Sequence, residues 1–524
     1  MPETIGNPIL PGFHPDPSIC RVGDDFYIAN STFEWFPGVR IHHSRDLKHW
    51  RLIGGALDRV SQLDMRGNPD SGGIWAPCLS WADGRFWLIY TNVRSVGPGY
   101  KDTPNFLVTS ENIEGPWSEP VYLNSSGFDP SLFHDDDGRK WLVNMVWDHR
   151  PGRHPFAGTL MQEYCVEQQK LVGPIRNICP GKMGTTEGPH LYKKDGWYYL
   201  MLAEGGTGVN HMVSVARSRQ LEGPYEFDPV TPMLTARKTD ARLQKAGHGS
   251  LVDTPTGQWY LVHLASRPIG PEKRCMLGRE TALQKVIWTE DGWLRLADGG
   301  TVPADDVPAP DLPTHPFDPP AATDDFDQPK LSGQLNTFRV PPSEDWLSLT
   351  ERPGWLRLRG RESLVSLHEQ SLVARRVEAF TCQAETKLEF APETFQQMAG
   401  LTAIYNTQMW YYLHVSCDAE LGRCLRLGVC DNGKFGEAGD PVALDDGPVW
   451  LKGLIADGQL QFAFSGDGRN WQDFGPVLDA TKLSDDYVNT RTWGFTGAFF
   501  GLCCQDLSGA HLAADFDFLR VENG

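Results

Sequence analysis

The sequence HPDPS occupies residues 14–18, and a short aromatic strand at 25–28 follows it. The same combination of an acidic or small polar motif and a following aromatic strand occurs five times. The motifs are Asp16-Pro17-Ser18, Ala76-Pro77-Cys78, Asp129-Pro130-Ser131, Glu187-Gly188-Pro189 and Gly247-His248-Gly249, and the strands lie at 25–28, 86–90, 140–143, 197–200 and 259–262. A repeat of roughly 50–60 residues is typical of a radial array. The sequence therefore predicts a five-bladed β-propeller.

The repeats also predict which side chains meet. The innermost strands of a propeller line one central channel, so the start of each repeat should converge on one mouth. Asp16, Asp129 and Glu187 would then share a pocket, and two carboxylates that flank a glycosidic bond can hydrolyse it. A third carboxylate raises the pKa of the acid, because like charges disfavour joint ionisation. The alternative is that Asp16 and Asp129, which precede prolines, only build turns.

The bulk composition excludes several classes of partner. The net charge of −19 argues against nucleic acid and anionic membranes. No run of about 20 apolar residues is long enough to span a bilayer. Residues 1–12 lack the basic and apolar regions of a signal peptide, and the 11 cysteines have no regular spacing, as expected of reduced thiols. These features predict a cytoplasmic protein; a chain from which a signal peptide was removed is the alternative.

A change in composition divides the chain. Residues 302–321 contain seven prolines and few large apolar side chains, which predicts a stiff, extended linker. We place the propeller at 1–302, the linker at 303–323 and a second domain at 324–524. Short alternating segments such as 410–415, separated by turn residues, predict that this second domain is a β-sandwich. The expected fold class is all-β, in agreement with 54 glycines and 39 prolines.

The motifs resemble those of glycoside hydrolase family 43. The segments 7–18, 127–131 and 186–190 carry the resemblance, and the likeness to two-domain β-xylosidases extends to 494–499 and 503–506. It implies a five-bladed propeller, a concanavalin-like jelly roll and an inverting mechanism. By the same resemblance, Asp16 is the general base, Glu187 the general acid, and Asp129 the carboxylate that tunes and positions the acid. Inversion requires the two catalytic carboxyl groups to lie roughly 6.5–9.5 Å apart.

Four further residues are candidates for sugar binding. The repeat places Trp75 at the channel mouth, where its indole can stack on a pyranose. Phe33 resembles a pocket residue of the family, and Arg279 matches a sugar-binding Arg that would also pair with Asp16. His248 is the counterpart of the carboxylates in the fifth repeat and should point into the channel. Ordinary blade packing, or a structural ion pair for Arg279, is the alternative.

The resemblance also implies that the second domain completes the pocket. In similar two-domain enzymes a sandwich loop closes the pocket with a Phe; we expect Phe499 to do so here, with Phe500 as the alternative. In relatives a His at the position of His248 sits near waters or calcium. Calcium prefers several oxygen ligands, so we expect no essential metal or cofactor, with calcium near His248 as the alternative.

These features predict an exo-acting β-1,4-xylosidase that releases xylose from the non-reducing ends of xylooligosaccharides with inversion. An α-L-arabinofuranosidase, alone or combined with xylosidase activity, is the first alternative. The second is a non-catalytic carbohydrate-binding propeller, against which the complete set of three carboxylates argues. Two-domain relatives commonly form dimers or tetramers, so we also expect a homo-oligomer.

Overall fold

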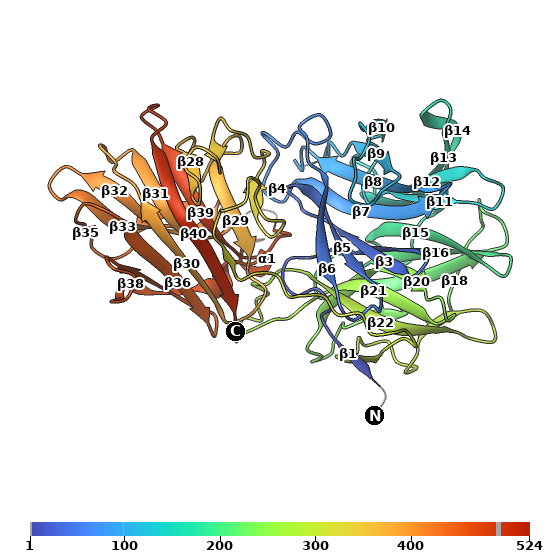
Figure 1. Cartoon of the computed structure of the whole chain (residues 1–524). Coiled ribbons are helices and arrows are strands. Elements are labelled where there is room, and N and C mark those ends of the chain that lie inside the picture. Colours follow the sequence, from blue (N-terminus) through green and yellow to red (C-terminus); the bar gives the residue numbers. More distant parts are fainter. Residues whose placement is uncertain (1–2, 98, 489–493) are drawn as a thin grey trace.

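The computed structural model describes residues 3–97, 99–488 and 494–524 and contains two β-domains side by side (Figure 1). The first residues build a five-bladed propeller, coloured blue to green, and the later ones a sandwich, coloured yellow to red. Within the described ranges, the helical elements are η1 (Ala480–Lys482) and α1 (Asp485–Val488). The predicted fold class is therefore confirmed.

Each blade is an antiparallel sheet whose four main strands follow one another in sequence order. The blades comprise β2 (Ser18–Val22), β3 (Asp25–Asn30), β5 (Gly38–Ser44) and β6 (Arg51–Leu57); β7 (Gly73–Ala82), β8 (Arg85–Val93), β9 (Asn105–Ser110) and β10 (Val121–Asn124); β11 (Ser131–His134), β12 (Lys140–Trp147), β13 (Phe156–Cys165) and β14 (Lys170–Cys179); β15 (Thr186–Lys194), β16 (Trp197–Glu204), β17 (Met212–Ser218) and β18 (Glu226–Phe227), with β19 (Leu234–Thr235) beside β17; and β20 (Gln244–Asp253), β21 (Trp259–Ser266), β22 (Glu280–Trp288) and β23 (Leu294–Leu296).

The first strands of successive blades contact one another around the centre, and β20 contacts β2 to close the ring. The aromatic strands of the sequence repeat are the second strands of the blades. Each interface between neighbouring blades holds its own buried hydrophobic cluster. One member of each cluster, in order round the ring, is Leu88, Leu142, Leu200, Leu261 and Ile28. Burial of one such side chain stabilises the fold by roughly 1.5–3 kcal/mol, so inter-blade packing is the main cohesive term of this domain.

A residue with left-handed backbone lies just before the inner strand in the first and third blades and within the inner strand in the other three. The backbone φ is 51° at Asp16, 32° at Ala76, 54° at Asp129, 55° at Gly188 and 51° at His248. The strand register shifts at this point in β7, β15 and β20, as it does at a β-bulge, which re-aims the neighbouring side chains. This alignment makes Asp16 and Asp129 equivalent, as predicted. It places Glu187 one residue earlier, at the position occupied by Trp75 and Phe128, so the predicted equivalence of Glu187 is wrong.

The second domain contains an eight-stranded and a nine-stranded sheet. In spatial order, the first is β27 (Leu347–Ser348), β28 (Leu356–Arg359), β40 (Ala513–Asn523), β30 (Cys382–Glu389), β36 (Val449–Ala456), β37 (Gln459–Ser465) and β38 (Gln472–Asp479), with β25 (Thr323–Asp324) on β40. The second is β34 (Lys434–Glu437), β33 (Gly422–Asp431), β32 (Met409–Asp418), β31 (Gln397–Asn406), β39 (Phe499–Asp506), β29 (Ser371–Arg376), β26 (Asn336–Phe338) and β4 (Trp35–Phe36), with β35 (Val442–Ala443) on β33.

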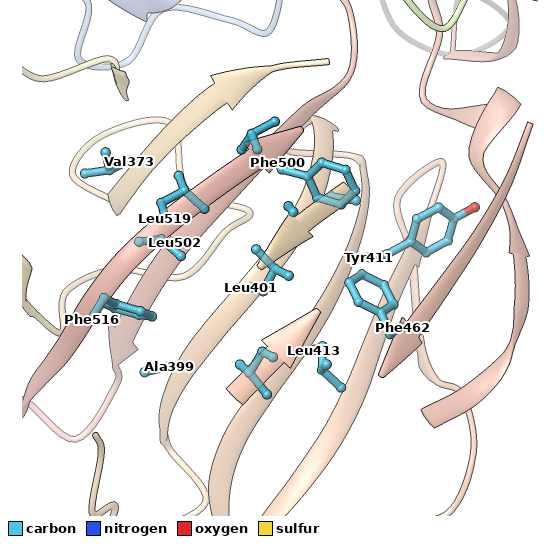
Figure 2. Packing of buried hydrophobic residues seen from close by; sticks show 14 of the residues in the cluster. Val373, Ala399, Leu401, Tyr411, Leu413, Phe462, Phe500, Leu502, Phe516 and Leu519 are labelled. Atoms are coloured by element: carbon cyan, nitrogen blue, oxygen red, sulfur yellow. The ribbon is translucent and has the colours of Figure 1, made fainter. Parts of the chain in front are cut away.

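The central strands of the nine-stranded sheet are buried on both faces. Phe500, Leu502 and Leu401 point from one face into the core between the two sheets (Figure 2). Because side chains alternate along a strand, Phe499 points from the other face, where it joins propeller residues in one hydrophobic cluster. Trp35 of that cluster lies on β4, a propeller segment that pairs with β26 and extends the sandwich sheet. The two domains therefore share a core.

The proline-rich segment is extended, as predicted, but it is not a free spacer. Its residues Asp306–Pro308 form β24, which pairs with β1 (Thr4–Gly6). Val307 is buried in the cluster between the first and last blades. The backbone N–H of His315 donates to Asp46, 2.7 Å away. Residues 306–308 of the predicted linker thus belong to a sheet, because the N-terminal segment offers them a strand partner.

A buried ion pair also joins the domains. Arg339 is 1% exposed and follows β26. Its guanidinium donates to the propeller carboxylate of Asp70 at 2.8 Å and to the carbonyl oxygen of Asn68 at 3.0 Å. Charged groups this deeply buried need such partners, so the pair fixes the relative position of the two domains.

Two further features concern the whole chain, its cysteines and its helices. All 11 cysteines are free, and most are buried, as expected of thiols that pack as small apolar groups. Among the described residues, no helix is long and apolar enough to cross a membrane.

Candidate active site

A cavity of about 340 Å³ at the mouth of the propeller contains all three predicted carboxylates. Its volume is near the lower end of the range of roughly 300–1,000 Å³ that is usual for ligand pockets. Both charged groups and aromatic side chains line it. The lining residues are Asp16, Phe33, Trp75, Lys101, Phe128, Asp129, Trp147, Phe156, Thr185, Glu187, Gly206, Thr207, His211, His248, Arg279 and Phe495.

Asp16 is held in place from several directions. Its Oδ2 accepts a hydrogen bond from Ser31 Oγ at 2.7 Å, and its Oδ1 accepts one from Arg279 Nη1 at 2.8 Å. The side chain of Asn30 donates to the carbonyl oxygens of the two residues before Asp16, at 3.1 and 3.0 Å. Arg279 and Asp16 are both nearly fully buried. The predicted pairing of Arg279 with Asp16 is therefore present, and the carboxylate is oriented before any ligand binds.

Asp129 contacts the strand that carries Glu187. Its Oδ2 accepts a hydrogen bond from the backbone N–H of Gly188 at 3.1 Å. Gly188 follows Glu187 directly in β15, so this contact positions the backbone of Glu187. The positive φ of Gly188, together with the bulge at this point, aims the Glu187 side chain at the cavity.

The electrostatics favour a proton on this pair of carboxyl groups. Burial, followed by the negative charge of Asp16, raises the pKa of Glu187 to about 7, while Arg279 and Lys101 oppose the rise. Burial and the charges of Glu187 and Asp16 also raise the pKa of Asp129 well above its usual value. Two interacting carboxyl groups titrate as a pair, and repulsion between them is mutual. The two carboxyl groups therefore retain a proton more readily than isolated ones would, next to the Asp16–Arg279 ion pair.

Lys101 is a member of the site that sequence analysis missed. Its Nζ lies 4.4 Å from the ring centroid of Trp147 and 6.0 Å from that of Trp75. Burial lowers the pKa of Lys101 to about 8, and the charge of Glu187 opposes this shift. Lys101 follows β8 in a long loop and belongs to no motif, so no sequence signal identified it.

The predicted aromatic residues Phe33 and Trp75 both line the cavity. Their ring centroids lie 6.2 Å apart, and each lies within 6 Å of the Phe495 ring. Trp75 Nε1 donates to the carbonyl oxygen of Ser71 at 2.7 Å, which fixes the indole. These contacts form one apolar wall suited to a sugar face.

Phe495, and not Phe499, is the sandwich residue in this wall. Phe499 is fully buried behind the wall, where its ring stacks on Trp35 with centroids 3.9 Å apart. Phe500 lies in the core between the two sandwich sheets (Figure 2). Both belong to β39, whose faces are already covered, whereas Phe495 lies in the preceding segment and reaches the cavity. Arg279 Nη2 donates to the Phe495 carbonyl oxygen at 3.2 Å, which attaches this segment to the site.

His248 lies in the cavity, as predicted from its place in the fifth repeat. Its Nδ1 is 3.7 Å from Asp16 Oδ1, and burial lowers its pKa, so the ring is neutral at pH 7. Among the described residues, no group of three or more His, Cys, Asp or Glu side chains is arranged to hold a metal ion. The expectation of a metal-independent site stays a prediction.

Sequence analysis missed several other lining residues. Phe128 precedes Asp129 as Trp75 precedes Ala76, so the repeat contained a signal for it. Thr207, which accepts a hydrogen bond from Arg279 at 3.1 Å, and His211 follow β16 in a loop with no motif. Trp147 and Phe156 lie at the ends of two strands of the third blade, where the blade pattern does not distinguish them from packing residues.

The fold and the site together define a class of protein. A propeller whose mouth gathers three carboxylates in a small aromatic pocket has the groups that glycoside hydrolysis needs. Residues 5–294 match the model of glycosyl hydrolases family 43, and residues 323–522 match the β-xylosidase C-terminal concanavalin A-like domain. The chain belongs to glycoside hydrolase family 43 and is a glycoside hydrolase, as the motifs indicated.

Similar proteins match along nearly their full length. A β-xylosidase of Bacillus subtilis is 49% identical over 99% of both chains. A xylosidase/arabinosidase of Humicola insolens is 50% identical over 99% of this chain and 97% of its own length. The crystal structure of a xylan β-1,4-xylosidase from Bacillus halodurans superimposes with a TM-score of 0.97, at 58% identity, over 99% of this chain and 100% of its own.

Proposed function

We propose that this protein is an exo-acting β-1,4-xylosidase that removes xylose from the non-reducing ends of xylooligosaccharides. The observation that carries the proposal is the cavity of about 340 Å³, in which three carboxylates face a wall of Phe33, Trp75 and Phe495. A pocket of this size suits a sugar and the start of the next one better than an open cleft for long chains. The names of the full-length relatives support the choice of xylose.

In the proposed reaction, Asp16 is the general base and Glu187 the general acid. Asp16, held by Arg279 and Ser31, takes a proton from a water that attacks the anomeric carbon. Glu187, whose pKa is about 7, gives its proton to the oxygen of the leaving sugar. Asp129 positions the acid through Gly188 and disfavours its ionisation. The configuration inverts, and we expect roughly 6.5–9.5 Å between the Asp16 and Glu187 carboxyl groups.

A second candidate activity is the release of arabinose from α-L-arabinofuranosides. One full-length relative is named a xylosidase/arabinosidase, and this observation supports a shared pocket for the two sugars. Furanose and pyranose pentoses present similar hydroxyl groups to Arg279 and the carboxylates. We propose xylose as the main substrate and arabinofuranosides as a secondary one.

A proton NMR time course with xylobiose tests the proposal, with the anomeric signals followed from the first minutes. Early α-xylose is the expected result and supports both the substrate and inversion. Early β-xylose would mean retention, and the roles given to Asp16 and Glu187 would then be wrong. If xylobiose is not cleaved but an arabinofuranoside is, the order of the two activities is reversed.

A further inference from the structure

A second cavity, with a volume of about 800 Å³, lies between the propeller, the linker and the sandwich. Arg40 and His42 of the first blade line it, and so do the linker residue Asp318 and Arg375 of the sandwich strand β29. None of these residues takes part in the proposed reaction. The cavity is therefore distinct from the pocket at the propeller mouth.

Three buried arginines gather at this cavity without a matching set of acids. Arg40, Arg375 and Arg376 are 3%, 6% and 1% exposed. Among the described residues, no carboxylate oxygen lies within 4.0 Å of a nitrogen of any of the three. Other buried arginines of this chain do have such a partner: Arg279 is 2.8 Å from Asp16, and Arg339 is 2.8 Å from Asp70. The three arginines therefore break the pattern that this chain otherwise follows.

The hydrogen bonds of these guanidinium groups go to neutral oxygens. Asn336 Oδ1 accepts from both Arg40 Nη1, at 3.0 Å, and Arg376 Nη1, which shows how close the two cations lie. Arg375 Nη1 donates to the carbonyl oxygens of Ala321 and Ala322, at 2.8 and 3.3 Å. Neutral acceptors satisfy single N–H groups but do not balance the positive charge.

Several buried nitrogen atoms in the same place have no hydrogen-bond partner among the described residues. They are Nε of Arg40, Nε of Arg375, Nη2 of Arg376, and Nδ1 of both His14 and His42. Of these residues, all except Arg376 line the cavity. An unpaired buried N–H costs about 1–3 kcal/mol, and more if it is charged, so the three guanidinium nitrogens call for an acceptor. Each histidine ring carries a proton on only one nitrogen when neutral, so its Nδ1 is either a donor or an acceptor.

The acidic groups nearby do not supply the missing acceptor for these arginines. Glu378 is the carboxylate closest to the cluster; its Oε1 lies 3.8 Å from His14 Nε2, and its side chain is 20% exposed. Burial lowers the pKa of Arg40 to about 10, and burial raises that of Glu378. Asp318, Asp324 and Asp325 also line the cavity, but no ion pair among the described residues joins them to the three arginines. Positive charge at the arginine side is thus left in excess.

We propose that the arginine side of this cavity binds a small oxyanion, such as phosphate, sulfate or the carboxylate of an organic acid. The planar guanidinium groups of Arg40 and Arg375 suit two oxygen atoms of such a group, and charge-assisted hydrogen bonds of this kind are the strong ones. The bound anion would neutralise the excess charge and join the first blade to β29 of the sandwich. The site would therefore stabilise the docked arrangement of the two domains.

The same cluster touches the segment that leads to the active site. Arg376 Nε donates to the carbonyl oxygen of Phe13 at 2.9 Å, three residues before Asp16. The ring of Phe13 contacts that of Phe33 in the active-site wall, with centroids 5.9 Å apart. We therefore expect anion binding to order residues 13–16 as well as the domain interface.

Thermal unfolding of the wild-type protein tests the site. The melting temperature is measured in 10 mM phosphate, sulfate or acetate, each against sodium chloride of equal ionic strength, which removes general screening. We expect at least one oxyanion to raise it by about 2–4 °C, since a ligand that binds only the folded state stabilises it. The phosphate, sulfate and acetate arms distinguish tetrahedral anions from carboxylates as the ligand.

Matched variants locate the effect. Arg375→Met should abolish the shift, because it removes one of the two guanidinium groups proposed to bind the anion. Arg423→Met is the control: Arg423 lies on β33 of the same sheet, also donates to backbone carbonyl oxygens and also has an unpaired nitrogen, but lies outside the cavity. The control should keep the shift. A shift that survives in Arg375→Met would place the anion elsewhere, for example at Arg279 of the active site, and would overturn the proposal.

A direct measurement covers the case in which Arg375→Met does not fold. Wild-type crystals are soaked in sodium selenate, and the anomalous difference map is inspected at the selenium edge. A peak between Arg40 and Arg375 is expected. A cavity that holds only water, or selenate bound only at other places, would refute the site. None of these measurements depends on catalysis, so their result is separate from that of the xylobiose experiment.

Discussion

At the scale of single residues, Glu187 is the most sensitive position. Its carboxyl group lines the cavity, and its pKa is raised to about 7. Replacement by Gln keeps the size of the side chain but removes the transferable proton. General acid catalysis contributes about 10²–10⁴-fold, so kcat should fall by that factor in Glu187→Gln.

The same variant should still bind xylose, because the aromatic wall and Arg279 are unchanged. Binding is followed by the change in tryptophan fluorescence, which Trp75 and Trp147 in the cavity should report. Hydrolysis of xylobiose at the wild-type rate would show that Glu187 is not the general acid. Loss of xylose binding together with catalysis would instead indicate a disrupted pocket.

Lys101 gives a second prediction at this scale, which concerns pH. Its positive charge lowers the pKa of Glu187, so removal of that charge should raise it. A higher pKa keeps the acid protonated to a higher pH. In Lys101→Met the alkaline limb of the profile of kcat/KM against pH should therefore move to higher pH, and not to lower pH.

Lys452→Met is the control for this experiment. Lys452 also lies over an indole, 4.0 Å from the Trp471 ring centroid, but on the sandwich and away from the cavity. Its profile should match that of the wild type. If the alkaline limb is unchanged in Lys101→Met, a group other than the Glu187–Lys101 pair controls the alkaline limb of the kcat/KM profile.

At the scale of elements, the bulge in β15 determines where Glu187 points. Gly188 has φ +55°, and a Cβ there would lie 3.0 Å from the His248 ring and 3.2 Å from Ala203. Gly188→Ala should therefore both strain the backbone and displace Glu187. We expect a loss of about 1–2 kcal/mol in the free energy of unfolding and a clear fall in kcat.

Gly196→Ala separates these two effects. Gly196 lies in the turn between β15 and β16, has φ +71°, and its added Cβ would meet only the end of the Arg219 side chain, at 3.3 Å. It should lose a similar amount of stability, measured by urea unfolding, but keep its kcat. Equal losses of kcat in both variants would mean that the bulge does not position the acid.

At the scale of the whole molecule, the two domains should unfold as one unit. They share a hydrophobic cluster that includes Trp35 and Phe499, and the buried pair of Arg339 and Asp70 crosses the interface. Arg339→Met would leave Asp70 buried without its counter-charge. Removal of one partner from a buried pair costs about 3–5 kcal/mol.

Urea unfolding, followed by tryptophan fluorescence and by circular dichroism, measures this loss. The control is Arg359→Met, which removes a pair with Glu351 in which each side chain is about one-third exposed; it should cost about 0–1 kcal/mol. A loss as small in Arg339→Met as in the control would contradict the role of the interface pair. Two separate transitions in the wild type would show that the domains unfold independently.

The sequence by itself determined the class of fold and the three carboxylates. Each blade repeats the same local pattern, so five copies define the propeller without any knowledge of contacts between blades. Asp16 and Asp129 occupy the same position in this repeat, and Glu187 lies one residue from it. Resemblance to a family then supplied Arg279 and Phe33, which the structure places beside the carboxylates.

Only the tertiary structure decided the rest of the site. Lys101 lies in a loop with no repeat or motif, whereas Phe495 lies in the 494–499 segment, where the resemblance pointed to Phe499 instead. Both reach the cavity because the chain returns to it across long separations in sequence. Phe499 was the wrong choice because strand alternation and the shared core bury it behind the wall. The arginines at the domain interface likewise gather from β5 and β29, which meet only after the sandwich docks on the propeller. A local pattern records the backbone that a segment adopts, whereas contacts between distant segments depend on how both domains pack.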